Sequence, residues 1–119
     1  MIVIRLPRPL SVNGLYYNHR SGGRAASLAH RNWRMTAMQE IGAQRTGWPE
    51  KSILGLYRLT LTVGPPAAGR RRGDLGNLEK CVSDVLVKMG VVRDDADAEE
   101  IVLCWGDVDG CEVKIESVA

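Results

Sequence analysis

The apolar residues of this chain repeat with two different periods, and this change of period limits the folds that the chain can adopt. Within residues 54–63 they alternate with polar residues, which is the pattern of a half-buried β-strand. Within residues 27–43, and again within 74–89, they recur every three or four residues, which predicts two amphipathic α-helices. A chain that contains both patterns is expected to pack helices against a sheet.

Shorter apolar segments complete the predicted fold. Residues 1–6 form a β-branched run that stops at prolines, and we expect a strand there. Residues 101–105 and 111–117 are separated by GDVDG, which predicts a hairpin with a five-residue loop. The elements then follow the order β-α-β-α-β-β. We predict one small α+β domain over residues 1–119, with a mixed β-sheet packed by two main helices.

Several kinds of protein are excluded or disfavoured by the composition. Cys81, Cys104 and Cys111 lack C-x-x-C spacing, which favours reduced thiols over a disulfide framework or a zinc site. No apolar run reaches the length of a membrane span and the start lacks the pattern of a signal peptide, so we expect a cytoplasmic protein without a membrane partner. The phosphate-binding glycine motifs are absent, so no nucleotide cofactor is expected.

The net charge of +2 conceals a strong division of charge along the chain. Residues 1–73 contain 12 Lys and Arg against only Glu40 and Glu50, a balance of +10. Residues 74–119 contain four Lys and Arg against 12 acids, a balance of −8. A basic half suits a polyanion partner, and an acidic half suits a cation site. Neutralisation of one half by the other within the fold is the alternative.

Residues 70–80 read RRRGDLGNLEK and join a Pro- and Gly-rich loop to the second predicted helix. The loop carries its three arginines into solvent, where they would contact phosphates. On the helical wheel Asp74 shares a face with Lys80, so the loop arginines and this face could meet one ligand. Asp74 could instead cap the first amides of the helix.

Carboxylates near this helix suggest a metal site. Acids without cysteine or histidine ligands favour a hard cation such as Mg²⁺ or Mn²⁺. If the VVRDD turn folds back against the helix start, Asp74 and Asp95, with Asp94, would hold the ion. Lys80 would then stabilise the charge that develops on a phosphate. A solvated acidic surface is the alternative. His19 and His30 have no partner at metal-ligand spacing, and we assign them no role.

Residues 11–27 are predicted to be a long loop in which two tyrosines precede Arg20 and Arg24. Aromatic residues interleaved with arginines suit base stacking and phosphate contact. A flexible surface loop with incidental charge fits these residues equally well.

The run RRRGDLGNLEK, followed by SDVLVKMGVVRDD, closely resembles the RusA family of Holliday-junction resolvases, which are crossover junction endodeoxyribonucleases. The family pattern here is an arginine cluster, D-x-D-N-L-x-K, a helix with an aspartate and then a D-D pair. The opening LPRPLSVNGLYY is also similar to the start of that family. The resemblance covers nearly the whole chain, and proteins of this family are often encoded by phages or prophages.

The resemblance implies a homodimeric, Mg²⁺- or Mn²⁺-dependent endonuclease that binds four-way DNA junctions and nicks two opposed strands symmetrically in recombination and repair. It implies catalytic roles for Asp74, Lys80 and Asp95, with Asp94 as a further metal ligand. Together with the residue patterns, it suggests the following DNA contacts: Arg70, Arg71, Arg72, Asn77, Lys80, Asn13, Arg20 and Arg24.

One position departs from the family pattern. Gly76 stands where the motif has its second aspartate. The nearest acid, Glu79, points about 60° away from position 76 on a helical wheel, so it is no obvious substitute. A catalytically weak or inactive junction-binding relative is therefore the alternative function. A plain structural or interaction domain is a third reading, and the charge division counts against it.

Overall fold

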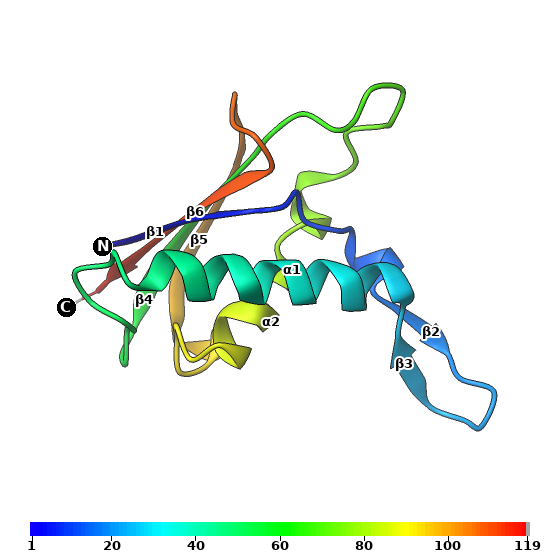
Figure 1. The fold of residues 1–119 in the computed structure, drawn as a ribbon, viewed down its shortest axis with the longest axis horizontal. Coiled ribbons are helices and arrows are strands. Elements are labelled where there is room, and N and C mark those ends of the chain that lie inside the picture. The colour runs from blue at the N-terminus through cyan, green and yellow to red at the C-terminus, as the bar shows by residue number, and fades with distance from the viewer. Residues whose placement is uncertain (119) are drawn as a thin grey trace.

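The computed structural model describes residues 1–118 and contains a four-stranded mixed sheet with two helices. The sheet order is β1-β6-β4-β5, and the strands are β1 (Ile2–Leu6), β4 (Tyr57–Val63), β5 (Ala98–Trp105) and β6 (Cys111–Ser117). The helices α1 (Leu28–Arg45) and α2 (Lys80–Lys88) lie on the same side of this sheet (Figure 1). The predicted single α+β domain with a mixed sheet and two main helices is confirmed.

β4 is one of the two interior strands of the sheet, and its inward side chains are fully buried. Tyr57, Leu59, Leu61 and Val63 are fully buried, while the residues between them are exposed or half-buried. β4 pairs in parallel with β5 and antiparallel with β6. The predicted alternation is confirmed, although the strand begins at Tyr57 rather than at residue 54.

The predicted hairpin between β5 and β6 is wrong, because β4 lies between these two strands. The connection of residues 106–110 crosses the end of β4, where the Gly64 amide donates to the Gly110 carbonyl at 2.8 Å. A Cβ on Gly64 would collide with the carbonyl oxygen of Val108, so this crossing requires glycine. A five-residue connection is long enough to span one intervening strand, and the arrangement buries β4 from both sides.

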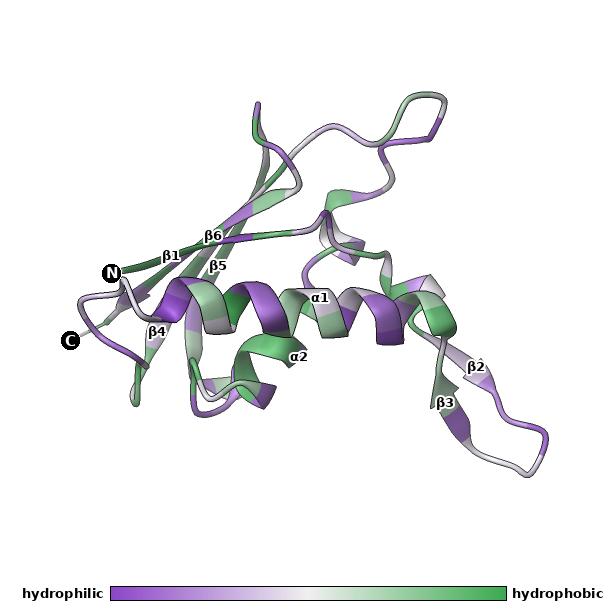
Figure 2. Ribbon diagram, viewed as in Figure 1, coloured by the Kyte–Doolittle hydropathy of each residue, from purple (hydrophilic) through white to green (hydrophobic). Residues whose placement is uncertain are grey.

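Helix α1 packs on the sheet through one stripe of side chains. Ser27 caps its start by accepting a hydrogen bond from the His30 amide at 3.1 Å, as its sequence position predicts. The buried residues are His30, Trp33, Ala37 and Ile41. Ala29, which the periodicity placed on this stripe, is exposed, and His30 is buried in its place. Figure 2 shows apolar and polar residues alternating around this helix.

Helix α1 extends beyond the predicted end at residue 43, whereas α2 ends at Lys88, next to its predicted end at residue 89. α1 continues to Arg45, whose guanidinium donates to the carbonyl oxygens of Met89 at 2.7 Å and Gly90 at 3.0 Å. These bonds satisfy free carbonyl groups at the end of α2 and stabilise the last turn of α1. Gly90 has a φ of 66°, in agreement with its predicted role at the end of the second helix.

The second helix is shorter than predicted. Residues 74–79 do not continue it, because Leu75–Asn77 form a separate 3₁₀ turn before α2 begins at Lys80. Asp74 precedes this turn and its side chain makes no capping hydrogen bond, so that role is not observed. Gly73, with a φ of 80°, and Gly76 both weaken helix formation here.

Residues 11–27, predicted to be a loop, contain a 3₁₀ turn (Val12–Gly14) and a two-stranded hairpin. The hairpin strands β2 (Tyr16–Asn18) and β3 (Arg24–Ala26) are antiparallel and project from the body of the molecule (Figure 1). Gly22 and Gly23 have φ values of 96° and 76°, which permit its tight turn. The glycines that indicated a loop in the sequence form the end of this hairpin.

The three thiols are free, as predicted, and Cys81 and Cys111 are buried. Burial raises the pKa of Cys81 to about 11 and that of Cys111 to about 12. Within residues 1–118 no helix is both long and apolar enough to cross a membrane.

Candidate active site

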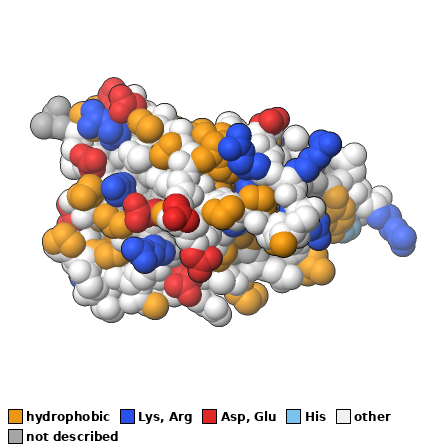
Figure 3. Space-filling model, turned by 90° about the horizontal axis from the view of Figure 1, so that it is seen from above, with side chains coloured by type: hydrophobic (Ala, Val, Ile, Leu, Met, Phe, Trp, Pro, Cys, Tyr) orange, Lys and Arg blue, Asp and Glu red, His pale blue; other side chains and the backbone are white. Residues whose placement is uncertain are grey.

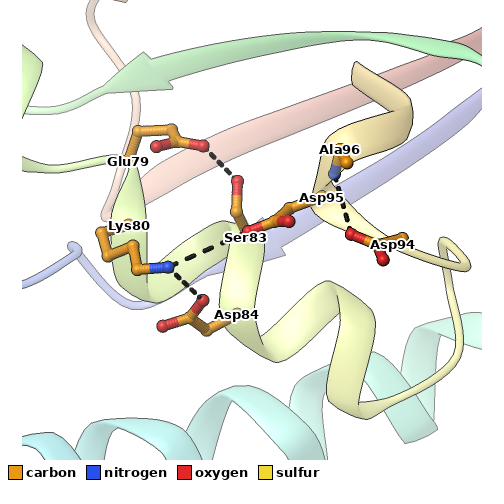
Figure 4. A network of polar contacts seen from close by, with 7 residues as sticks. All are labelled: Glu79, Lys80, Ser83, Asp84, Asp94, Asp95 and Ala96. Carbon is orange, nitrogen blue, oxygen red and sulfur yellow. Dashed lines mark hydrogen bonds and ion pairs between the residues drawn. The ribbon is translucent and has the colours of Figure 1, made fainter.

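A network of charged side chains forms where α2 meets the segment that precedes β5 (Figure 4). The Lys80 ammonium lies 3.0 Å from a carboxylate oxygen of Asp84 and 3.9 Å from one of Asp95. Its hydrogen bond to Asp84 is the main cause that raises the pKa of Lys80, and Asp95 adds a smaller effect. Lys80 therefore remains a cation between two carboxylates that are distant in sequence.

Local contacts fix the segment that carries Asp95. Residues Asp95–Asp97 form a 3₁₀ turn, and the Ala96 amide donates to the Asp94 carboxylate at 2.9 Å. This hydrogen bond, and then the side chain of Asp95, hold the pKa of Asp94 below its ordinary value. Arg93 forms a two-bond ion pair with Asp97, with both distances at 3.0 Å. These bonds orient the turn so that Asp95 faces α2.

Beside this network lies a groove of about 530 Å³. It is lined by Tyr16, His30, Arg34, Lys80, Asp84, Val87, Lys88, Asp94 and Asp95. The Nδ1 atom of His30 lies 3.1 Å from the carbonyl oxygen of Leu15 and donates to it. No sequence pattern indicated a role for this histidine, because its groove partners on α2 are about 50 residues away. A larger groove of about 840 Å³ lies elsewhere and contains none of the predicted site residues.

A second polar pair, Glu79 and Ser83, lies at the start of α2, and Tyr57 of β4 is buried. The Ser83 hydroxyl donates to the Glu79 carboxylate, and Ser83 is buried. Tyr57 is 0% exposed, and its hydroxyl has no hydrogen-bond partner among residues 1–118. Burial, and then the negative charges of Asp95 and Glu79, raise the pKa of Tyr57 to about 12. The hydroxyl therefore lies within the electrostatic reach of both acids.

The predicted arginine cluster lies on an exposed loop between β4 and the 3₁₀ turn at Leu75. Arg72 stacks over the ring of Trp105, with its guanidinium carbon 4.5 Å from the ring centroid. Arg8 donates to the carbonyl oxygen of Arg72 at 2.7 Å and to that of Gly64 at 3.1 Å. Arg70, Arg71 and Arg72 are all exposed. The loop is therefore anchored at both ends while its arginines face solvent.

The hairpin β2–β3 carries two further predicted DNA contacts, Arg20 and Arg24, which are exposed. Arg24 lies 5.0 Å from the ring centroid of Tyr16, which packs edge-on against His30. Figure 3 shows basic side chains, without acidic ones, at the end of the molecule where the hairpin projects. The hairpin thus extends a basic surface from the groove.

The remaining predicted residues are not all gathered at the network. Asp74 is exposed and precedes the 3₁₀ turn that contains Asn77, while Asn13 lies in the 3₁₀ turn before β2. Among residues 1–118, no three His, Cys, Asp or Glu side chains converge at metal-ligand spacing. The predicted ligand set of Asp74, Asp94 and Asp95 is therefore not assembled as one cluster in this conformation.

Comparison with known proteins identifies the family. The family model described as Endodeoxyribonuclease RusA matches residues 11–116 of the chain. The match begins just before the 3₁₀ turn at Val12 and ends within β6. It includes every residue of the network. No curated protein matches the chain.

Proposed function

The chain belongs to the RusA family of endodeoxyribonucleases, and on this premise we propose that it resolves four-way (Holliday) DNA junctions by paired, symmetric, metal-dependent nicks. The activity would serve DNA recombination and repair. The observation that carries the proposal is the position of Lys80 between Asp84 and Asp95, at the start of a helix and beside a groove. This arrangement combines a cation for phosphate with carboxylates for a metal ion.

Asp95, with Asp94 and Asp74, would hold Mg²⁺ or Mn²⁺. The chemistry of the donor set suits a hard cation because these side chains offer only oxygen atoms. When bound, such an ion activates water and neutralises charge on the scissile phosphate. Because the three aspartates do not converge in this conformation, ion binding would have to draw Asp74 toward Asp95.

Lys80 would stabilise the extra negative charge that develops on the phosphate. Its hydrogen bond to Asp84 keeps it protonated and orients its ammonium toward Asp95. Only the part of this interaction that strengthens as charge develops would accelerate the reaction. Asp84 is then a positioning residue that acts through Lys80.

The DNA would follow the exposed basic surface. Arg70, Arg71 and Arg72 would contact phosphates beside the cleaved bond, since their loop is anchored by Arg8 and Trp105. Further contacts would come from the hairpin and the two 3₁₀ turns through Arg20, Arg24, Asn13 and Asn77. A homodimer is part of the proposal, because symmetric nicks need two matched sites related by a two-fold axis.

Cleavage of a labelled synthetic four-way junction, with and without Mg²⁺ or Mn²⁺, tests the proposal. We expect paired nicks at symmetric positions that require the metal, and salt-sensitive binding on the same samples. Binding without nicks would favour the alternative function, a junction-binding relative that has lost the chemistry. Gly76 is the specific observation that supports this alternative, since it removes one carboxylate from the family motif.

A further inference from the structure

We propose that the groove beside the Lys80 network binds a further backbone phosphate of the DNA strand that is cut, and that Arg34 and Lys88 hold this phosphate. This subsite rests on the proposed function, because it adds a second phosphate position to the strand that meets Lys80. Neither Arg34 nor Lys88 is among the DNA contacts predicted from the sequence. The packing of α1 beside α2 brings both residues to the same groove.

The groove, of about 530 Å³, is built from four segments of the chain: α1, α2, the turn before β5 and the hairpin strand β2. Figure 4 shows Lys80 and Asp84 on the side of α2 that faces α1. Lys80 and Lys88 both line the groove, and they are about two turns, or about 12 Å, apart along α2. A DNA strand carries one phosphate per about 3.4 Å of helix axis. A strand that meets Lys80 therefore presents a further phosphate toward Lys88.

The charges that line the groove are not evenly neutralised. Lys80 is paired, because its ammonium lies 3.0 Å from the Asp84 carboxylate and 3.9 Å from that of Asp95. Within residues 1–118, neither Arg34 nor Lys88 forms an ion pair. Their positive charges are therefore available to an anion in the groove.

Arg34 suits phosphate recognition by its burial as well as by its charge. It is half-buried, whereas Arg31, one turn earlier on α1, is exposed. A guanidinium offers five N–H donors in a planar fork that matches two oxygen atoms of a phosphate. Partial exclusion of water strengthens such charge-assisted hydrogen bonds. Lys88 adds a second charge from the opposite helix, so one phosphate would be held from two sides.

The wall between α1 and the hairpin is fixed by contacts that do not use Arg34. His30 is only 2% exposed, and its Nδ1 atom donates to the carbonyl oxygen of Leu15 at 3.1 Å. The ring of Tyr16 packs edge-on against His30, with the ring centroids 5.4 Å apart. Arg24 lies over the other partner of this pair, 5.0 Å from the ring centroid of Tyr16. The groove therefore opens toward Arg24, and a strand held by Arg34 continues onto the basic hairpin.

The salt dependence of junction binding tests the subsite. A labelled four-way junction is titrated with the protein in EDTA at several salt concentrations, so that binding is measured without metal-dependent cleavage. Loss of one phosphate contact lowers the slope of log K against log salt concentration by about 1. We expect this change in Arg34→Gln and in Lys88→Gln, with binding weakened by roughly 10-fold in each. Because both side chains hold one phosphate, the double variant should lose little more than either single variant.

Lys114→Gln is the matched control, because it removes the same charge from the face of β6 opposite the buried Val113 and Ile115. Its salt slope should equal that of the wild type, and an equal loss would overturn the subsite by showing that net charge alone matters. A wild-type slope in Lys88→Gln would also overturn it. Lys88 is exposed, so this variant decides even if Arg34→Gln does not fold. A slope lowered by about 2 in the double variant would overturn the shared phosphate.

Junction cleavage with Mn²⁺ is measured on the same preparations to separate the subsite from the proposed function. Variants with lowered slopes, together with a wild-type protein that makes no nicks, would retain the subsite and remove the proposed chemistry. A wild-type protein that makes nicks, while both single variants keep its salt slope, loses only the subsite. A wild-type protein that does not bind the junction overturns the subsite directly, and its cleavage result then decides the proposed function alone.

Discussion

Two side-chain pairs at the start of α2 are one residue apart and have the same spacing of four residues, yet they lie in different surroundings. Lys80 and Asp84 form an ion pair at the edge of a groove. Glu79, which precedes α2, accepts a hydrogen bond from Ser83, and Ser83 is buried. One residue along a helix is a rotation of about 100°. Because of this rotation, Lys80 neutralises the Asp84 carboxylate, whereas the Glu79 carboxylate keeps its negative charge.

Asp95 lies where the two flanks meet. We therefore expect its substitution to reduce cleavage more than substitution in either pair. It contacts Lys80 on one flank, and its charge acts on Tyr57 on the other. We propose that phosphate stabilisation lies on the Lys80 flank and that Asp95 contributes to metal binding. Substitutions of one side chain at a time test this proposal.

Asp95→Asn should have the largest effect, because it changes both flanks together. We expect junction cleavage to fall by roughly 1,000-fold, since a metal ion supplies several kcal/mol of stabilisation to the reacting phosphate. Junction binding should be preserved or strengthened, because one carboxylate that repels phosphate is removed. Single-turnover cleavage and a gel-shift titration measure the two effects. Full cleavage by this variant would remove Asp95 from the mechanism.

Lys80→Gln should have the next largest effect and should leave the metal ligands intact. Loss of the ammonium is expected to reduce the cleavage rate by about 100-fold, which is typical of one preorganised charge in a transition state. Mn²⁺ affinity should not fall, since no carboxylate is removed. Asp84→Asn is the matched comparison: it should reduce cleavage less, because Lys80 keeps its charge. Equal losses in both variants would mean that Asp84 does more than position Lys80.

Gly76→Asp should raise cleavage several-fold if the site lacks a carboxylate. The structure has room for this side chain, because a Cβ at position 76 meets nothing within 4 Å and the glycine does not have a positive φ. Cleavage rates and thermal unfolding of the variant are measured together. No gain in a folded variant would indicate that the site is already complete or that it is lost for another reason.

Tyr57→Phe should have the smallest effect on cleavage and a distinct effect on stability. Removal of an unpaired buried hydroxyl is expected to raise the free energy of unfolding by about 1 kcal/mol in the absence of metal. Chemical denaturation measures this change, with the exposed Tyr17→Phe as the control. An unchanged or reduced stability would contradict the assignment of an unpaired hydroxyl.

Tyr57→Phe should also change how the free energy of unfolding depends on pH in the alkaline range. Burial raises the pKa of Tyr57 from 10.0 to about 12, so the folded protein holds this proton more tightly than the unfolded chain. The stabilisation is therefore present below pH 10 and is lost between pH 10 and 12. Tyr57→Phe should remove this part of the alkaline loss. The rest of the alkaline loss of stability should remain in this variant, because the raised pKa values of Cys81 and Cys111 contribute to it in the same way.

The sequence by itself determined what depends on neighbours along the chain. The alternation within residues 57–63, the cap at Ser27 and the glycine after α2 follow from local hydrogen bonding and from the period of burial. The Lys80–Asp84 pair also follows from helical spacing. The extent of α2 was misjudged, because the apolar spacing of residues 74–79 is compatible with a 3₁₀ turn as well as an α-helix.

Only the tertiary structure decided which distant segments meet. The order of strands places β4 between β5 and β6, although loop length alone favoured a hairpin. The same packing brings Asp95 to Lys80, places His30 in their groove and buries the Tyr57 hydroxyl. No local sequence pattern indicates contacts of this kind. They arise from the packing that buries β4 from both sides and do not depend on the spacing of residues along the chain.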